Sequence, residues 1–327
     1  MNSKEFLEKY MPLIGKKVND NVFIVKKLTK TTVLNKYIEL YIETKMQNAY
    51  IEESNFDICL ILEEVIDICH LLGIEEKKEW ENLDTMPHSI GNSKIGDDTL
   101  VISFNSSLLC YMALLGKCSN CNICYGKNSN KMYSNEFLKG CIGQMALLLH
   151  SNSKKELFKL IYNTIWSIYC SYSEKELAKI KYLRINVIGD ILNNDQLKDI
   201  NTIAKAIKTV FNLNCCYSYT HNDNLDLSIA KDIVFNCSDF SNDKNKECQT
   251  IFEFDIDNYN EEEEVLCNGH CFNCPYCKSE FECRKVLFLA HGGQFEGIEG
   301  IPSEFVAYLE YNKECDYLLF MRQLAMV

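Results

Sequence analysis

The chain has 327 residues, with 34 Lys and Arg against 46 Asp and Glu, which gives a formal net charge of −12. This acidic balance argues against a protein that coats nucleic acid through general electrostatic attraction. Hydrophobic residues make up 47%, beside 14 glycines and 4 prolines, so a fibrous or low-complexity chain is excluded and one large domain or two smaller ones are expected. The unusual number is 18 cysteines, which points to disulfides or to metal.

The N-terminal sequence helps to choose between disulfides and metal. Residues 1–8 (MNSKEFLE) lack the basic start and the apolar run of roughly 7–15 residues that a secretory signal peptide needs. A run of about 18 uncharged apolar residues is also missing, so neither a transmembrane helix nor a membrane partner is expected. We therefore expect a cytoplasmic protein, in which closely spaced cysteines are more often metal ligands than disulfides.

Residues 1–95 are expected to form a helical accessory region. Apolar residues recur at three- and four-residue spacing in two stretches, VLNKYIELYIETKM (33–46) and FDICLILEEVIDICHLL (56–72). This part of the chain contains no chemical motif. We therefore interpret its apolar stripes as ordinary helix core.

Strands and helices alternate from residue 96 onward. Strands are predicted at 100–104, 182–190, 213–220, 233–235, 250–255 and 285–290, and helices at 135–150, 155–172, 195–212 and near 225–230. This alternation predicts right-handed βαβ units and a parallel sheet. The expected fold class is α/β, with a partial (β/α) barrel of about six parallel strands whose function gathers at the carboxyl ends of the strands. The barrel core is assigned to residues 96–260, and the final strand, the tail and a cysteine-rich segment to residues 261–327.

A first group of cysteines follows the first predicted strand, in the segment KCSNCNICYG. It consists of Cys118, Cys121 and Cys124. Structural zinc needs four ligands, whereas three thiolates on a [4Fe–4S] cluster leave one iron open for a cofactor or substrate. The count of three therefore favours an open cluster, with Cys110 or Cys141 as the residue that would complete a zinc site instead.

A second group consists of Cys267, Cys271, Cys274 and Cys277, spaced C-x3-C-x2-C-x2-C. Four thiolates suffice for a complete site that holds zinc or a fully ligated iron–sulfur cluster. The ferredoxin-like density of the last three cysteines favours iron and sulfur, and zinc is the alternative. Most other cysteines are scattered among apolar neighbours, where we expect small core residues.

Two features of the second predicted strand also suggest a site. Gly189 precedes Asp190 at the end of this strand, so the carboxylate can approach a cofactor closely. The alternative is a turn acid, since Asp195 is the better N-cap for the helix that follows. Arg184 lies inside the apolar strand, where an unpaired charge is costly, and it requires a carboxylate from the protein or from a ligand.

The order strand, cysteine triad, helix, strand ending in a glycine–acid pair resembles the radical S-adenosylmethionine (radical SAM) superfamily of iron–sulfur proteins. This resemblance implies a [4Fe–4S] cluster on Cys118, Cys121 and Cys124, whose open iron chelates S-adenosylmethionine. It also implies that Gly189 and Asp190 contact the methionine amino group of that cofactor.

A closer resemblance, over about residues 96–293, is to the phage gene product 88-like family. It rests on a cysteine group ending in Cys-Tyr, an Arg-x4-Gly-Asp strand, a Tyr-Thr strand end, and a Cys-x2-Cys-x2-Cys group leading to His291-Gly292. We carry over cofactor-binding roles to the residues that match these motifs, namely Tyr125, Arg184, Gly189, Asp190 and Tyr219.

Two functions are considered. The first is an iron–sulfur protein, a radical SAM-like enzyme with one or two [4Fe–4S] clusters and S-adenosylmethionine, supplied with electrons by a donor protein. The second is a non-catalytic module, stabilised by zinc or a cluster, that binds nucleic acid or a partner protein. The acidic balance, and the lack of a Lys and Arg stripe around either cysteine group, count against nucleic acid.

Overall fold

The computed structural model describes part of the chain. The described residues are 8, 11–13, 17–19, 25–27, 71, 83–91, 95–105, 110, 112, 134–240, 246–251, 260, 262–267, 271, 274–278 and 285–289. The helical stretches predicted at 33–46 and 56–72 lie outside them, apart from Leu71, which is helical. Near the N-terminus the described residues form the short 3-10 helix η1 (Met11–Leu13). They also form an antiparallel pair of short strands, β1 (Lys17–Asn19) and β2 (Val25–Lys27).

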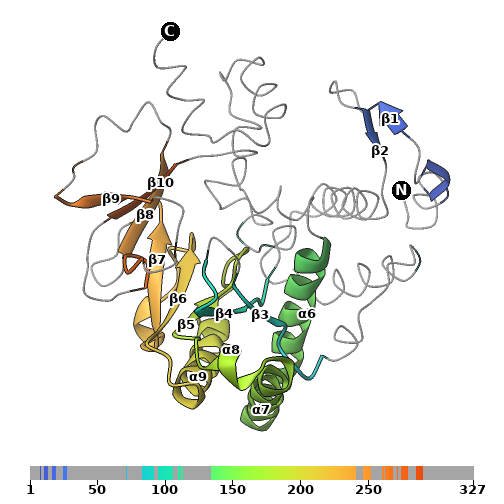
Figure 1. The fold of residues 1–327 in the computed structure, drawn as a ribbon, viewed down its shortest axis with the longest axis horizontal. Helices are drawn as coiled ribbons and strands as arrows, with labels where there is room; N and C mark the ends of the chain where they lie inside the picture. Colours follow the sequence, from blue (N-terminus) through green and yellow to red (C-terminus); the bar gives the residue numbers. More distant parts are fainter. Residues whose placement is uncertain are drawn as a thin grey trace.

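An eight-stranded sheet organises the described residues from His88 onward (Figure 1). Its spatial order is β3 (His88–Ile90), β4 (Thr99–Ile102), β5 (Tyr182–Ile185), β6 (Cys215–Thr220), β7 (Ile233–Ser238), β8 (Lys246–Ile251), β10 (Lys285–Leu289) and β9 (Glu264–Leu266). β3 is antiparallel to β4, and all other neighbours in this sheet are parallel. The predicted α/β class and parallel sheet are confirmed.

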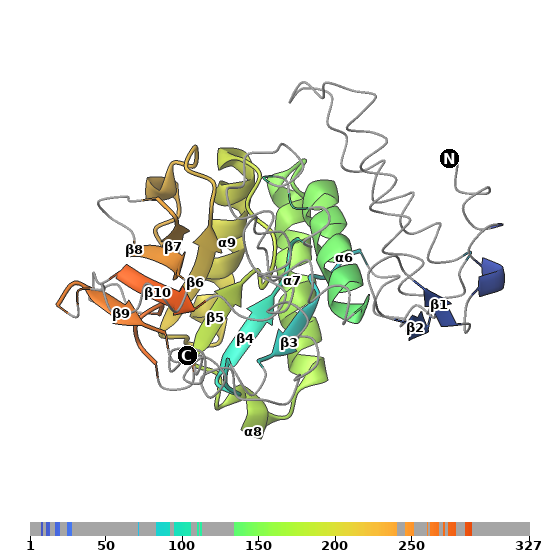
Figure 2. The same cartoon turned by 90° about the horizontal axis from the view of Figure 1, so that it is seen from above.

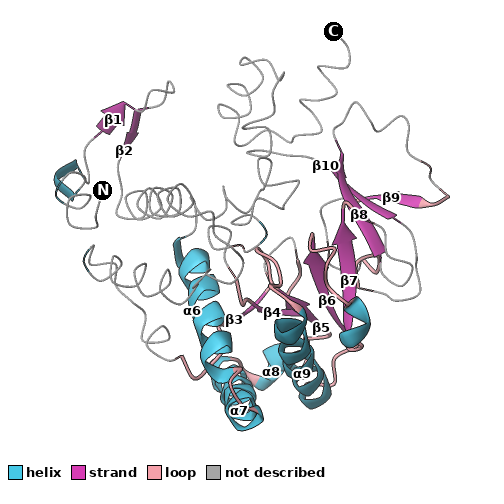
Figure 3. Ribbon diagram, turned by 180° about the vertical axis from the view of Figure 1, so that it is seen from behind, coloured by secondary structure: helices cyan, strands magenta, loops and turns pink. Residues whose placement is uncertain are grey.

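The helices lie on one side of this sheet (Figures 1, 2 and 3). They are α6 (Ser134–His150), α7 (Lys154–Ser171), the short α8 (Glu174–Leu177) and α9 (Asn194–Val210), with the 3-10 turn η4 (Leu227–Ile229) before β7. α7 packs against both α6 and α9. Right-handed crossovers between neighbouring parallel strands place successive helices on the same face, which explains this arrangement. None of the described helices is long and apolar enough to cross a membrane.

The main hydrophobic core fills the space between the helices and the sheet. Strand residues such as Leu183 and Ile185 meet helix residues such as Leu160 and Ile203, and all four are fully or almost fully buried. Successive residues of a strand point to opposite faces, so the alternate positions of the same strands face away from the helices. A second, smaller cluster forms on that opposite face, from Cys215, Tyr217 and Val234 with Tyr182 and Tyr219 packed against it.

Helix α9 begins at an asparagine. The side chain of Asn193 accepts hydrogen bonds from the backbone amides of Asp195 (3.1 Å) and Gln196 (2.9 Å). The expectation that Asp195 would cap this helix is therefore wrong. Asp195 lies inside the first turn, where its carboxylate accepts a hydrogen bond from Lys198.

Replacing Asn193 by alanine is expected to lower the free energy of unfolding by about 1 kcal/mol, because two amides of the first turn lose their acceptor. The matched control is Asp195→Ala, which removes an exposed ion pair and should cost only roughly 0.5 kcal/mol or less. Urea unfolding of both variants measures the difference. An equal or larger loss in Asp195→Ala would contradict the cap assignment.

His88 in β3 is a half-buried histidine beside α7. Its Nε2 lies 3.0 Å from the Ser167 hydroxyl, and its Nδ1 lies 3.4 Å from the Tyr172 hydroxyl. Burial, together with the charge of Lys139, lowers the pKa of His88 to about 4. Between pH 6.5 and 4 the unfolded chain therefore binds a proton at this residue that the folded protein does not bind.

The stabilising contribution of neutral His88 is expected to be lost as the pH falls from about 6.5 to about 4. The full difference corresponds to roughly 3 kcal/mol of unfolding free energy. Comparing urea unfolding of the protein and of His88→Gln at pH 7 and pH 4.5 isolates this residue. If the pH dependence is the same in both proteins, the neutral histidine is not its cause.

Candidate metal centre

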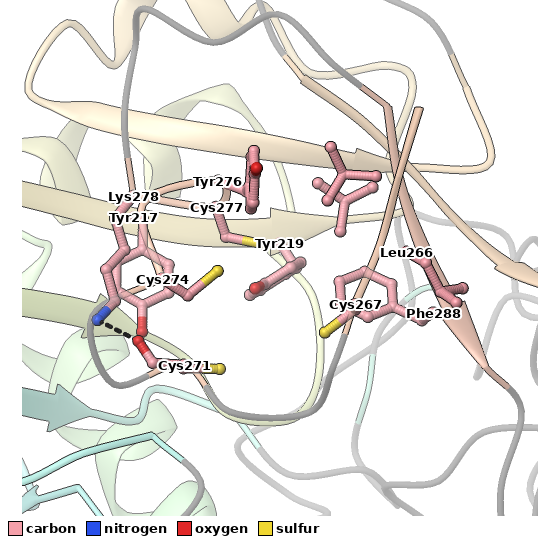
Figure 4. A pocket seen from close by; sticks show the side chains of 12 residues that line it. Tyr217, Tyr219, Leu266, Cys267, Cys271, Cys274, Tyr276, Cys277, Lys278 and Phe288 are labelled. Carbon is pink, nitrogen blue, oxygen red and sulfur yellow. Dashed lines mark hydrogen bonds between the residues drawn. The ribbon is translucent and has the colours of Figure 1, made fainter. Parts of the chain in front are cut away.

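Four cysteines line a single pocket on the sheet face that points away from the helices. They are Cys267, Cys271, Cys274 and Cys277, and the cavity between them has a volume of about 60 Å³. Figure 4 shows their sulfur atoms around a common space. Cys267 directly follows β9, and the other three belong to the connection between β9 and β10. The structure thus brings together all four residues that the spacing selected for the second site.

The cysteine connection is anchored to the sheet by named contacts. The Cys267 amide donates to the Leu287 carbonyl in β10 (2.8 Å), and the Cys274 amide donates to the Cys271 carbonyl (3.2 Å). Asn236, which is fully buried in β7, donates its side-chain amide to the Cys277 carbonyl (3.1 Å). These hydrogen bonds therefore hold the backbone of the described cysteines in place against the sheet.

Aromatic and aliphatic side chains form the remaining walls. Tyr219 of β6 lies edge-on to Tyr217, with 6.3 Å between the ring centroids, and edge-on to Phe288 of β10, with 6.0 Å between the centroids. Other wall residues are Val265, Leu266, Tyr276 and Val286. These walls give the pocket a mostly apolar lining, and an apolar surrounding lowers the local dielectric and strengthens electrostatic interactions.

The four thiols influence one another electrostatically. Burial, and to a smaller extent the neighbouring Cys267, Cys271 and Cys274, raise the pKa of the Cys277 thiol to about 12. A hydrogen bond with Tyr219 acts in the opposite direction. An empty pocket therefore favours protonated sulfur at Cys277. A metal centre that binds there must displace the proton, and it supplies the positive charge that lets the thiolates share one cavity.

Two cationic side chains lie close to this thiol pocket. Lys278 is only 4% exposed; its ammonium group donates to the Cys271 carbonyl (2.9 Å) and lies 4.0 Å from the Asp98 carboxylate and 4.1 Å from the centre of the Tyr182 ring. The guanidinium of Arg184 lies 5.2 Å from the centre of the Tyr219 ring. A buried lysine is costly unless compensating groups are near, and here the Asp98 carboxylate, the Cys271 carbonyl and the Tyr182 ring supply that compensation.

Arg184 was expected to require a carboxylate partner. Its Nε donates to the Asn186 carbonyl (3.3 Å), and its guanidinium lies over the Tyr219 ring. By register it neighbours Tyr217 of β6, and it belongs to the sheet face that carries the thiol pocket. The structure thus places Arg184 and Tyr219, both assigned to cofactor binding, next to each other beside the four thiols.

Gly189 and Asp190 do not belong to the residues that line the thiol pocket. The buried Asp190 carboxylate accepts hydrogen bonds from the Ile191 amide (2.7 Å), the Thr220 hydroxyl (2.6 Å) and the His221 amide (2.6 Å). Burial raises the pKa of Asp190, and these hydrogen bonds oppose that rise. The carboxylate thereby ties the end of β5 to the end of β6.

Gly189 is needed where it stands for two reasons. Its φ is +83°, a conformation that L side chains rarely adopt, and a Cβ there would come within 2.6 Å of the Asn105 side chain. The same Asn105 donates its side-chain amide to the Asp190 carbonyl (2.6 Å). The carboxyl ends of β4, β5 and β6 are therefore joined through the Gly189–Asp190 turn.

Other residues of the site could not be singled out by their spacing. Lys278 and Tyr276 flank Cys277 within the cysteine segment, and their proximity to the cysteines was the only available signal. Asn236 carries no signal at all, since a lone asparagine in a short predicted strand does not reveal which loop it will hold.

His221 and Asp239, 3.7 Å apart, meet at the ends of β6 and β7.

The first cysteine group lies outside the described residues. Cys118, Cys121 and Cys124, together with Tyr125, are therefore not placed relative to the thiol pocket. Among the residues that the structure does describe, no group of three or more His, Cys, Asp or Glu side chains is arranged so that it could hold a metal ion. The thiols thus surround a cavity and do not converge on a point.

In comparisons with known proteins, no protein-family model, no curated protein and no solved structure matches the chain.

Proposed function

We propose that the chain is an iron–sulfur protein that holds a [4Fe–4S] cluster on Cys267, Cys271, Cys274 and Cys277. The observation that carries this proposal is that the four cysteines line one pocket whose other walls are mostly apolar. Four cysteine thiolates are the usual ligand set of such a cluster. Four cysteine thiolates are also the ligand set of a structural zinc site. The volume of the pocket is therefore used to distinguish zinc from an iron–sulfur cluster.

The size of the cavity favours a cluster over zinc. In a zinc site each sulfur lies about 2.3 Å from one ion, so the four sulfurs crowd together and leave no space between them. The cavity here, about 60 Å³, is several times the roughly 10–15 Å³ that one water molecule requires. A compact group of four irons and four sulfides needs such a space, and its surface can meet thiols that do not converge on a point.

The cations beside the pocket support the same proposal. Lys278 and Arg184 lie on the pocket's side of the sheet, with Tyr219 between the guanidinium and the Cys277 sulfur. Positive charge and hydrogen bonds near the sulfurs stabilise the more negative, reduced state of a cluster. These residues would therefore help the centre to accept an electron.

We further propose that the sheet forms a partial (β/α) barrel and that the protein is a radical SAM-like enzyme. Strands β4 to β8 follow chain order without the reversal that defines a doubly wound sheet. The described helices α6, α7, α8 and α9 lie on one face of the sheet, and the thiol pocket lies on the other. In this proposal Cys118, Cys121 and Cys124 hold a second [4Fe–4S] cluster whose open iron binds S-adenosylmethionine.

The cofactor-binding residues would then act in two ways. Arg184 and Tyr219 face the ligand side of the sheet, where a guanidinium and an aromatic ring suit a carboxylate and an adenine. Gly189 and Asp190 would act by shaping the strand end, because the Asp190 carboxylate already accepts three hydrogen bonds from its own chain. Tyr125 directly follows Cys124 and would pack beside the first cluster. An electron-donor protein would reduce the clusters.

Anaerobic purification followed by iron, sulfide and zinc analysis tests the proposal. We expect a brown protein with about four irons and four sulfides per chain from the thiol pocket, and about eight of each if the first group is also loaded. Incubation of the reduced protein with S-adenosylmethionine is expected to release 5′-deoxyadenosine. A colourless protein with stoichiometric zinc and no sulfide would overturn the iron–sulfur proposal.

A further inference from the structure

Helix α7 carries a row of exposed aromatic side chains. Phe158, Tyr162, Trp166 and Tyr169 are 62%, 68%, 62% and 45% exposed. Their spacing of four, four and three residues aligns them on one face of the helix. Single exposed apolar residues are ordinary on protein surfaces, but four aligned aromatic rings form a contiguous patch of the kind that marks an interaction surface. We name these four residues the α7 aromatic face.

The opposite face of α7 explains why these rings point outward. Leu157, Leu160, Ile161, Thr164 and Ile168 are buried on that side. α6 and α9 pack along the two flanks of α7 (Figure 2). The aromatic face is therefore the outer surface of the helical layer, whereas the thiol pocket lies on the other face of the sheet. An interaction at the α7 aromatic face does not depend on what the pocket holds.

Both ends of α7 carry charged side chains: Lys154 and Lys155 precede Glu156 at its start, and Glu174 and Glu176 flank Lys175 just beyond its end. Lys154 and Lys155 are exposed in the first turn, where the helix dipole disfavours a positive charge. Beyond the other end, Glu174 is exposed in the first turn of α8. Between these ends the large exposed side chains of α7 are the four aromatic rings, and the exposed Lys159 pairs with Asp84 at 3.0 Å.

We propose that the α7 aromatic face binds the same face of a second copy of the chain, with the two helices antiparallel about a twofold axis near Tyr162 and Trp166. A twofold contact is self-complementary, so each end of one helix meets the opposite end of its partner. The lysine end of each copy then lies against the carboxyl end of the other α7 and its Glu174. This pairing turns an unfavourable placement of Lys154 and Lys155 within one chain into an attraction between two chains.

The area of the patch agrees with a dimer. Large aromatic side chains bury about 150–250 Å² each when fully covered, so four rings that are roughly 60% exposed contribute on the order of 450 Å² per copy. Two copies together bury about 900 Å² from these rings. The exposed Leu149 and Val210, which end the flanking helices, and the lysine stems bring the total to roughly the 1,000 Å² that a specific interface needs.

Sedimentation equilibrium of the full chain tests this proposal. The protein is expected to be a dimer that dissociates on dilution, and Trp166→Ser is expected to raise the dissociation constant by about thirtyfold or more, as truncation of a central aromatic anchor does. Tyr162→Ser is a second variant for the same purpose. Circular dichroism checks that each variant is folded.

A charge exchange tests the antiparallel geometry. Lys155→Glu and Glu174→Lys are each expected to raise the dissociation constant by about tenfold at low salt, and the double variant is expected to restore it, since the two charges are exchanged across the twofold axis. Lys205→Glu, an exposed lysine on α9, is the matched control and should change nothing.

A dimer that Trp166→Ser leaves intact would overturn the proposal, and so would a chain that stays monomeric at all concentrations. A monomer that floats with vesicles of phosphatidylcholine and phosphatidylserine would assign the α7 aromatic face to a membrane surface instead. A dimer in which the double charge variant is weaker than both single variants would exclude the antiparallel arrangement.

Discussion

Cys277→Ala is expected to remove the iron of the thiol pocket, a loss of about four irons and four sulfides per chain. The carbonyl of Cys277 is held by Asn236, and its sulfur is hydrogen-bonded with Tyr219. Its loss leaves three thiols and an apolar gap in the wall. Since a complete cluster needs every iron ligated, the remaining cysteines should not retain it against dilution or a chelator.

The matched control for this experiment is Cys170→Ser. Cys170 is exposed on α7, on the helical side of the sheet, and it should leave iron content and the visible spectrum unchanged. Iron and sulfide are measured after anaerobic reconstitution of both variants under the same conditions. If Cys277→Ala keeps its full iron content, the ligand assignment for this pocket is wrong.

Asp190→Ala is expected to lower the free energy of unfolding by about 4–6 kcal/mol, a large share of the stability of an ordinary domain. The variant leaves the Thr220 hydroxyl and the amides of Ile191 and His221 without their acceptor. Each buried donor that loses a charged or polar acceptor costs on the order of 1–3 kcal/mol. Asp190 is itself only 3% exposed, so water cannot easily replace the carboxylate.

Asp190→Asn is a second, more conservative variant for comparison with Asp190→Ala. It keeps the volume and one acceptor oxygen, so it should cost about half as much as the alanine variant. Urea unfolding of both variants, with Asp195→Ala as an exposed control, measures the series. A cost below about 1 kcal/mol for Asp190→Ala would show that these hydrogen bonds contribute little, and the carboxylate would again be a candidate for direct cofactor binding.

The predictability of the fold varied with the length and pattern of its elements. The strands predicted near 100, 215, 233 and 285 and the helices α6, α7 and α9 are confirmed, because each has either a buried apolar run or apolar residues at helical spacing. The strand predicted at 182–190 ends at Ile185, so Gly189 and Asp190 belong to the turn that follows it. Of the strand predicted at 250–255, only residues 250 and 251 are described, as the end of β8. β3, β9 and α8 were not predicted. They have only three or four residues, too few for a periodic pattern, and β3 and β9 exist as strands because β4 and β10 offer them hydrogen bonds.

How far the candidate site could be predicted also depended on whether its residues are close together in the sequence. Cysteine spacing selected Cys267, Cys271, Cys274 and Cys277, which share one pocket, because ligands in one short connection must lie near one another. The same local pattern contains no information on Tyr219, Phe288 or Asn236. These residues reach the thiols through the pairing of β6, β7 and β10, which are separated from the cysteines along the chain.

The unusual number of cysteines shows the same contrast between local sequence pattern and tertiary structure. The sequence by itself determined the α/β class, the order of the long elements and the four thiols of the pocket, because periodicity and short-range spacing are local properties. Burial of Cys215, Cys216, Cys237 and Cys248 agrees with the core role expected of scattered cysteines. Only the tertiary structure decided that Asp190 ties strand ends together, that Lys278 is buried beside the thiols and that α7 presents its aromatic residues outward. Each of these depends on which distant segments the sheet brings into contact.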